Sequence, residues 1–122
     1  MKTAMKLSAI TMLVFLTILT SCSSDDDNIN DVLLSEAEIP TAIKTYIETH
    51  FPSNTIVRAE KDTENNTITY EIYLNENINL EFDSATNIID IDGVIQLPNS
   101  VIPQSILDYV SVNYPNNVIT DW

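Results

Sequence analysis

The sequence predicts an α+β fold in which two helices lie on one face of a four-stranded antiparallel meander. Three observations support this prediction. Apolar residues recur at helical spacing in two stretches, period-two alternation marks four runs between them, and one set of motifs occurs twice. A length of 122 residues accommodates one such domain together with an N-terminal targeting segment.

The two helical stretches belong to an internal repeat. The motif Ile-Pro-x-x-Ile-x-x-Tyr begins at Ile39 and again at Ile102. The motif Phe-Pro-x-Asn-x-Ile begins at Phe51 and returns, with tyrosine in its first position, at Tyr114. Both motifs recur after 63 residues, which indicates two copies of one structural unit.

The first helix is expected between two prolines. Pro40 suits the first turn, where a missing N–H costs nothing, and Pro52 ends the helix. The apolar stripe of this helix consists of Ile39, Ala42, Ile43, Tyr46 and Ile47. The second copy repeats the stripe and its limits with Pro103, Ile106, Tyr109, Val110 and Pro115. We therefore expect the second helix to cover the apolar side of the same sheet.

Four strands are expected between the helices, over residues 55–61, 67–74, 77–82 and 88–92. Apolar and polar residues alternate along them, so one face of the sheet is predicted to be buried and the other to face water. The connections are short and polar. Asn66, Asn77 and Asn87 are expected to serve in turns where glycine is usual, since asparagine tolerates positive φ.

The N-terminal residues predict a targeting signal. Lys2 and Lys6 precede an apolar run of 13 residues, Leu7 to Leu19, which is too short to span a membrane and is typical of a secretory signal. The run ends in a segment that resembles the bacterial lipobox, namely Leu19, Thr20, Ser21 and Cys22. Residues 1–21 are thus predicted to be a lipoprotein signal peptide, and Cys22 is predicted to carry the lipid that anchors the protein to a membrane. A plain signal peptide is the alternative.

The residues after the cysteine predict where the anchored protein faces. The segment Ser23, Ser24, Asp25, Asp26 and Asp27 resembles the acidic signal that directs Bacteroidota lipoproteins to the cell surface. The alternative is a solvated acidic linker. Residues 22–34 are predicted to be a tether, on an outer-membrane protein that is exposed at the surface or, alternatively, faces the periplasm.

Composition excludes several functions. The chain has 18 acidic and 5 basic residues, so its net charge of −13 argues against nucleic acid as a partner. One cysteine and one histidine, His50, leave no zinc site, and the single glycine, Gly93, leaves no phosphate-binding loop. Asp83, Asp90 and Asp92 form a loose acidic group without the spacing of a calcium loop. We expect no enzyme activity, no cofactor and no metal.

The order of motifs resembles the PepSY-like, β-lactamase-inhibitor-like family. The resemblance rests on the two repeated motifs and on Ala59-Glu60-Lys61-Asp62, Tyr70-Glu71-Ile72-Tyr73-Leu74 and Leu80-Glu81-Phe82-Asp83. It implies a domain over residues 35–122, with unit one at about 37–94 and a partial unit two at about 101–122. The stretch Val118–Trp122 has the composition of a strand, expected either to pair with the first unit's sheet or to stay unpaired.

The resemblance implies a function as a non-catalytic, surface-anchored module that binds a protein or peptide, with or without inhibiting it. The alternative is an envelope lipoprotein that holds a small or ionic ligand in a pocket. Two further residues are candidate sites. Ser84 lies in Asp83-Ser84-Ala85, which resembles a short O-glycosylation motif, and Tyr73 is predicted to stand on the wet face of the sheet as a binding aromatic. An isolated surface tyrosine is the alternative for Tyr73.

Overall fold

The structure is a computed structural model that describes residues 31–122. The strands are β1 (Val32–Leu33), β2 (Ile56–Glu64), β3 (Thr67–Leu74), β4 (Ile78–Asp83) and β5 (Ile88–Asp92), and the helices are α1 (Thr41–His50) and α2 (Gln104–Asn113). Short 3-10 turns lie at Asn75–Asn77 and Asn99–Val101. The predicted α+β class is confirmed.

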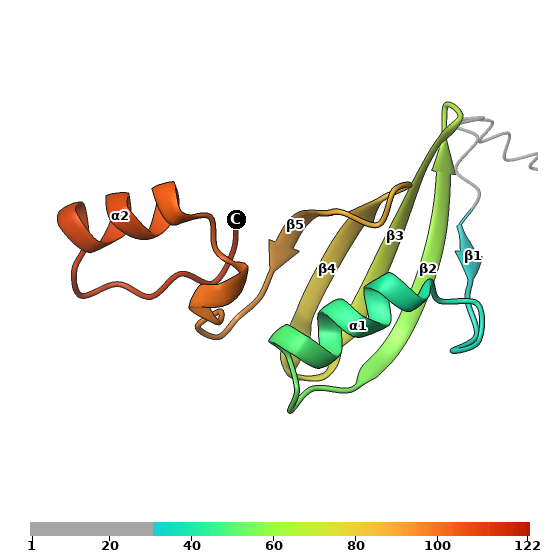
Figure 1. The fold of residues 1–122 in the computed structure, drawn as a ribbon, viewed down its shortest axis with the longest axis horizontal. Helices are drawn as coiled ribbons and strands as arrows, with labels where there is room; N and C mark the ends of the chain where they lie inside the picture. The colour runs from blue at the N-terminus through green and yellow to red at the C-terminus, as the bar shows by residue number, and fades with distance from the viewer. Residues whose placement is uncertain (1–30) are drawn as a thin grey trace, which may run out of the picture.

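The strands form one antiparallel sheet in the order β1-β2-β3-β4-β5, and α1 lies across one face of it (Figure 1). The sheet has five strands where four were expected. The additional strand, β1, pairs Val32 with Lys61 and Leu33 with Glu60, within the stretch that the sequence predicts to be tether. Two paired residues are too few to produce a recognisable alternation, so this strand is visible only in the tertiary structure.

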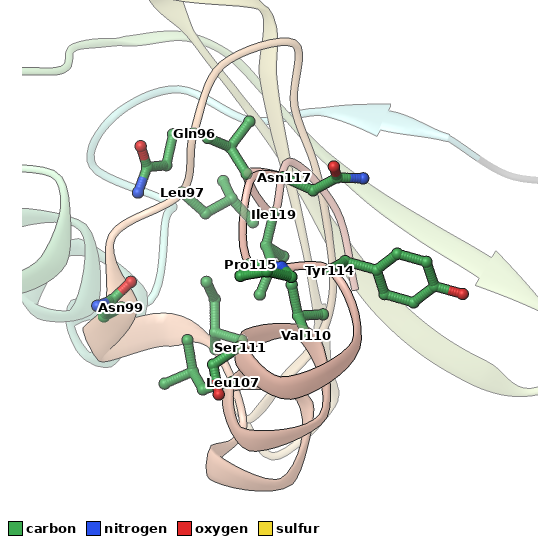
Figure 2. A pocket seen from close by; sticks show the side chains of 12 residues that line it. Gln96, Leu97, Asn99, Leu107, Val110, Ser111, Tyr114, Pro115, Asn117 and Ile119 are labelled. Carbon is green, nitrogen blue, oxygen red and sulfur yellow. The ribbon is translucent and has the colours of Figure 1, made fainter.

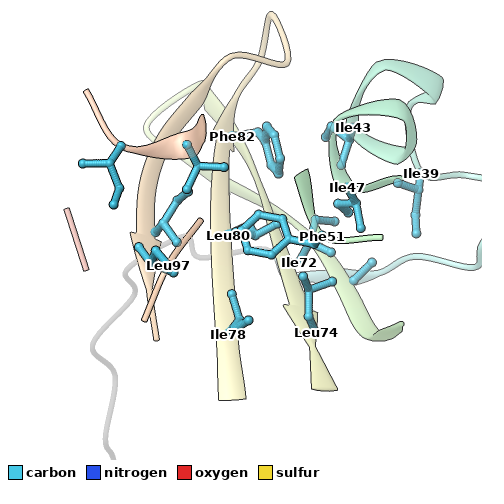
Figure 3. Packing of buried hydrophobic residues seen from close by; sticks show 14 residues of the cluster. Ile39, Ile43, Ile47, Phe51, Ile72, Leu74, Ile78, Leu80, Phe82 and Leu97 are labelled. Carbon is cyan, nitrogen blue, oxygen red and sulfur yellow. The ribbon is translucent and has the colours of Figure 1, made fainter. Parts of the chain in front are cut away.

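The first helix forms as expected and contributes Ile43 and Ile47 to the core. Pro40 precedes it with φ −53°, and the Phe51 N–H donates to the Ile47 carbonyl at 2.8 Å to close its end. Ile43 and Ile47 face the sheet, where they meet apolar side chains of β3 and β4 (Figure 3). The buried core residues are Ile39, Ile43, Ile47, Phe51, Ala59, Ile72, Leu74, Ile78, Leu80, Phe82, Ile91, Leu97, Val101 and Ile102.

The turns use left-handed backbone, but not at every predicted residue. Asn66 and Asn77 have φ of 65° and 57°, as expected. In the β4–β5 turn the left-handed residue is Thr86, with φ 68°, and not Asn87. The reason is a hydrogen-bond network in which Asn87 donates its backbone N–H and side-chain amide to the Asp83 carboxylate, an interaction that favours the other backbone conformation.

The second helix does not lie over the sheet beside α1, and this corrects the prediction. It lies beyond β5, at the end of the molecule remote from β1 (Figure 1). None of its residues is buried, and Tyr109, predicted to cover the sheet, is 59% exposed. Because α1 already occupies the apolar face, only Ile106 and Leu107 of the second helix reach the edge of the core.

The C-terminal stretch pairs with β5, so the first of the two expected outcomes holds. The Ile91 N–H donates to the Trp122 carbonyl at 3.1 Å, and the Trp122 N–H returns a bond to the Ile91 carbonyl at 3.0 Å. The Leu97 N–H donates to the Ile119 carbonyl at 2.8 Å. Trp122 thereby pairs with the edge of β5, although residues 118–122 form no strand of the sheet.

Candidate functional site

The sheet face opposite α1 is the candidate site, and we call it the open face. Within residues 31–122 no helix covers it (Figure 1). Side chains on each strand alternate between the two faces, so the neighbours of core residues Ile72, Leu80 and Ile91 point to the open face. Strand register then arranges these polar side chains in rows that cross the sheet.

The central row consists of four carboxylates, which we call the carboxylate row. Glu60 on β2 pairs with Glu71 on β3, Glu71 pairs with Glu81 on β4, and Glu81 pairs with Asp90 on β5. Residues directly opposite one another on neighbouring antiparallel strands have Cβ atoms roughly 4.5–5.5 Å apart. Four like charges therefore stand side by side across four strands.

The electrostatics of the row appear in Glu81. Partial burial is the largest cause that raises the pKa of the Glu81 carboxyl above its usual 4.5. The negative charges of Glu71, Asp90 and Asp62 raise the pKa further. A cation placed over the row would act against this repulsion, since an opposite charge favours the ionised carboxylate.

An aromatic and a cation flank the row. Tyr73, the predicted binding aromatic, lies on the open face and donates its hydroxyl to Glu71. This hydrogen bond is the main reason that the pKa of Tyr73 rises to about 12. The Arg58 guanidinium lies 5.5 Å from the centre of the Tyr73 ring and forms an ion pair with Glu60. Tyr73 is thus held in place by Glu71 and Arg58.

The remaining rows add further acidic groups. Asp62 pairs with Thr69 and Thr69 with Asp83, while Asn79 pairs with Asp92. The Oδ1 atoms of Asp62 and Asn79 are shielded from solvent and accept no hydrogen bond from the described residues. Shielded acceptor oxygens without a donor are uncommon in proteins, because such groups usually find partners.

The hollows of the described structure are small or lie at its margins. One of about 190 Å³ lies between the linker after β5, α2 and the C-terminal stretch, where Leu97, Leu107 and Ile119 converge (Figure 2). Small-molecule sites usually measure roughly 300–1,000 Å³, so this hollow is undersized. A hollow of about 420 Å³ lies at the outer edge of β2, beside Leu34 and Val57.

Ser84 and His50 lie outside the rows of the open face. Ser84 is exposed in the β4–β5 turn, where the Asp83 carboxylate accepts the Ala85 and Asn87 N–H groups at 2.9 and 2.8 Å. The bonds from Asn87 are the main reason that the pKa of Asp83 lies below its usual value. His50 ends α1, with its Nδ1 atom 2.9 Å from the Ser100 hydroxyl.

Several predicted features lie outside the described residues, namely Leu19, Thr20, Ser21, Cys22, Ser23, Ser24, Asp25, Asp26 and Asp27. In residues 31–122, no helix is long and apolar enough to cross a membrane. The same part of the chain contains no group of three or more His, Cys, Asp or Glu side chains placed to hold one metal ion.

The carboxylate row itself was missed at the sequence level. Only Asp83, Asp90 and Asp92 attract attention there, as a loose group. Alternation places Glu71 and Glu81 on the wet face, but their alignment with Glu60 and Asp90 depends on register. The alternating runs around Glu71 and Glu81, joined by a short turn, were the available signal.

The described residues form a small α+β domain with one covered and one uncovered sheet face. The family described as "Putative beta-lactamase-inhibitor-like, PepSY-like" matches residues 28–90 and 91–121. The chain belongs to this family. The two matches begin 63 residues apart, the same spacing as the repeated motifs.

Solved structures from Bacteroides share the fold. A "putative calcium-regulated periplasmic protein" from Bacteroides thetaiotaomicron superposes with a TM-score of 0.69 at 24% identity, over 75% of this chain and 72% of that one. Two Bacteroides vulgatus proteins described as periplasmic have TM-scores of 0.68 and 0.70 at 27% and 26% identity. The two superpositions cover 80% and 75% of this chain, and each covers 75% of the Bacteroides vulgatus protein. No curated protein matches.

Proposed function

We propose that this protein is a non-catalytic module that binds a protein or peptide partner on the open face of its sheet. The observation that carries the proposal is the uncovered polar face of β2–β5, on which Tyr73 is held by Glu71 and Arg58. An aromatic fixed by its neighbours loses little conformational freedom on binding, which makes it a good anchor at an interface. The inhibitor-like description of the family supports the same class of function.

A small or ionic ligand in a pocket is the weaker candidate. The word "calcium-regulated" describes one structural neighbour, whose 24% identity supports a shared fold only. The hollow beside α2 is undersized for most ligands, the larger hollows of about 420 and 570 Å³ lie at the edge of the sheet beside Leu34 and Val57, and residues 31–122 present no ready group of metal ligands. An extended face suits a macromolecular partner better than a small one.

The proposed location is the cell envelope, which agrees with the periplasmic description of the neighbours. We propose in addition that Cys22 carries a lipid and that Ser23 to Asp27 directs the protein to the outer surface. A glyceryl-linked cysteine bears at least two acyl chains, and two chains are enough for stable anchoring.

The lipid anchor is tested at its attachment residue. Cys22→Ala is expected to abolish acylation, because the chain has no other cysteine. Metabolic labelling with a palmitate analogue measures the result, with Ser24→Ala as the matched control that keeps its label. Labelling of the Cys22→Ala protein at the control level would refute the anchor.

The binding face is tested by site-specific photocrosslinking in intact cells. A photoreactive residue at Tyr73 is expected to give discrete protein adducts that excess unlabelled protein suppresses. The control is the same residue at Val112 on α2, which is 79% exposed but lies away from the open face. Adducts of equal yield at both positions, or none at Tyr73, would contradict the proposal.

A further inference from the structure

We propose that the partner presents a basic segment whose lysine or arginine side chains lie along the carboxylate row of the open face. This inference rests on the proposed function and specifies the chemistry of the partner. It concerns the charge of the bound segment and is tested separately from the existence of a partner.

The negative charge of the open face favours a basic partner. The three rows that cross the open face hold seven carboxylates, namely Glu60, Asp62, Glu71, Glu81, Asp83, Asp90 and Asp92. Arg58 is the only cation in these rows, and it is already paired with Glu60. Interfaces generally place positive potential against negative potential, which speeds encounter and excludes wrong partners. A face of this composition fits a basic segment and repels an acidic one.

The carboxylate row also places like charges opposite one another, which sheets usually avoid. Like charges directly opposite each other on neighbouring strands destabilise a sheet, and here three successive pairs do so. Violations of local rules are expected at functional sites, where another requirement outweighs the loss. The pKa of Glu81 lies above its usual value, first because of partial burial and then because of the charges of Glu71, Asp90 and Asp62.

Two side-chain oxygens without a hydrogen-bond donor lie on the same face. The Oδ1 atoms of Asp62 and Asn79, one row to either side of the carboxylate row, lack a donor among the described residues. Ammonium and guanidinium groups carry three and five N–H donors and no acceptor. Side chains of this kind, laid along the row, would supply the opposite charge, and they would reach the two shielded oxygens only after neighbouring side chains move.

The spacing of the carboxylates also distinguishes a basic segment from a bare metal ion as the partner of the row. A calcium ion needs six to eight oxygen ligands around one point. The carboxylates are instead spread along a line, one per strand, and the described residues contain no cluster of metal ligands. A series of cations at the spacing of strands, about 4.8 Å, matches a polypeptide with several basic side chains.

The test compares defined peptides on matched variants of the purified protein. The probes are a lysine–serine peptide, a glutamate–serine peptide of equal length, and calcium chloride alone. The test variant is Glu71→Gln with Glu81→Gln. The control variant is Glu36→Gln with Glu48→Gln, which changes the net charge equally at exposed positions before and on α1. Calorimetry measures affinity, and circular dichroism checks folding.

The lysine peptide is expected to bind the unchanged protein and to bind more weakly as salt is raised. The test variant should lose roughly tenfold in affinity, which corresponds to about 1.4 kcal/mol, and the control variant should stay within roughly twofold. Equal losses in both variants would overturn the proposal, because net charge would then explain the binding. Binding of the glutamate peptide, or of calcium with the same dependence on Glu71 and Glu81, would also overturn it. If no lysine peptide binds while crosslinks at Tyr73 persist, the basic segment is wrong and the binding module stands.

Discussion

The two repeat units place matching residues in unequal surroundings. Ile43 on α1 is completely buried, whereas its counterpart Ile106 on α2 is only partly buried. Phe51 is 3% exposed, and its counterpart Tyr114 is 50% exposed. The helices themselves are alike, since each has ten residues, follows a proline and ends with an N–H bonded four residues back. Similar sequence motifs therefore produce the same local structure, while burial depends on what lies opposite.

What lies opposite differs greatly. α1 packs against β3 and β4, whose Ile72, Leu80 and Phe82 are fully buried beneath it (Figure 3). α2 faces only the linker after β5 and the C-terminal stretch, with the small hollow of Figure 2 between them. The first unit thus holds most of the core, to which the second adds Val101 and Ile102, and α2 is attached at the edge. Four predictions test or refine this contrast.

The largest effect is expected from loss of the linker rather than of α2. Leu97, Val101 and Ile102 of the linker are core residues. A chain that ends at Gly93 loses all three, at about 1.5–3 kcal/mol each, out of a typical total stability of about 5–15 kcal/mol. A chain that ends at Pro103 keeps them. Thermal melting should show a cooperative transition for the longer chain and none for the shorter one. Absence of a transition in both would mean that α2 or the C-terminal stretch is required for the core.

The next effect compares equivalent isoleucines. Ile43→Ala should destabilise the protein by roughly 2–5 kcal/mol, because it leaves a cavity in the core. Ile106→Ala should destabilise it by about 1 kcal/mol, as expected for a partly exposed position. Urea denaturation measures both values. Equal losses would show that the second unit is as well packed as the first.

A smaller effect concerns Gly93, where the two units meet. A Cβ atom at this position would lie 3.1 Å from the Thr120 carbonyl oxygen, so the C-terminal stretch must move away. Gly93→Ala should therefore loosen the pairing of Trp122 with Ile91 and change overall stability by less than about 1 kcal/mol. Trp122 is the only tryptophan, so a red shift of fluorescence reports the loosening. Ala85→Ser in the β4–β5 turn should leave the fluorescence unchanged, and an unchanged spectrum for Gly93→Ala would refute the prediction.

The smallest effect concerns the open face, which belongs to the first unit. The pKa of Glu81 lies above its unfolded value of 4.5, so the folded protein binds this proton more tightly. Stability therefore falls as pH rises from about 4.5 through the raised pKa. Glu81→Gln removes this loss and should stabilise the protein by about 0.2–1 kcal/mol at pH 7. The gain should vanish below pH about 4.5 in urea titrations, whereas Glu48→Gln should show no such trend. A gain that is independent of pH would contradict the assigned cause.

Part of the candidate site follows from sequence alone. Alternation along residues 67–74 and 77–82 assigns Tyr73, Glu71 and Glu81 to the wet face, and the structure places them there. The row requires more, because Glu60 and Asp90 align with them only through register. The register shifts between Ile56 and Arg58 in the β2–β3 pair and between Glu81 and Phe82 in the β4–β5 pair. Alternation within a single strand does not reveal such shifts.

The sequence by itself determined the local structure, namely both helices, four of the five strands and the repeat of 63 residues. These features depend on residues two to four positions apart and on prolines, whose effects act within one turn or one strand. Only the tertiary structure decided the two-residue strand β1, the exposed position of α2 and the pairing of Trp122 with Ile91. Each of these depends on segments far apart in the chain, and α2 lies beyond β5 because α1 already occupies the apolar face of the sheet.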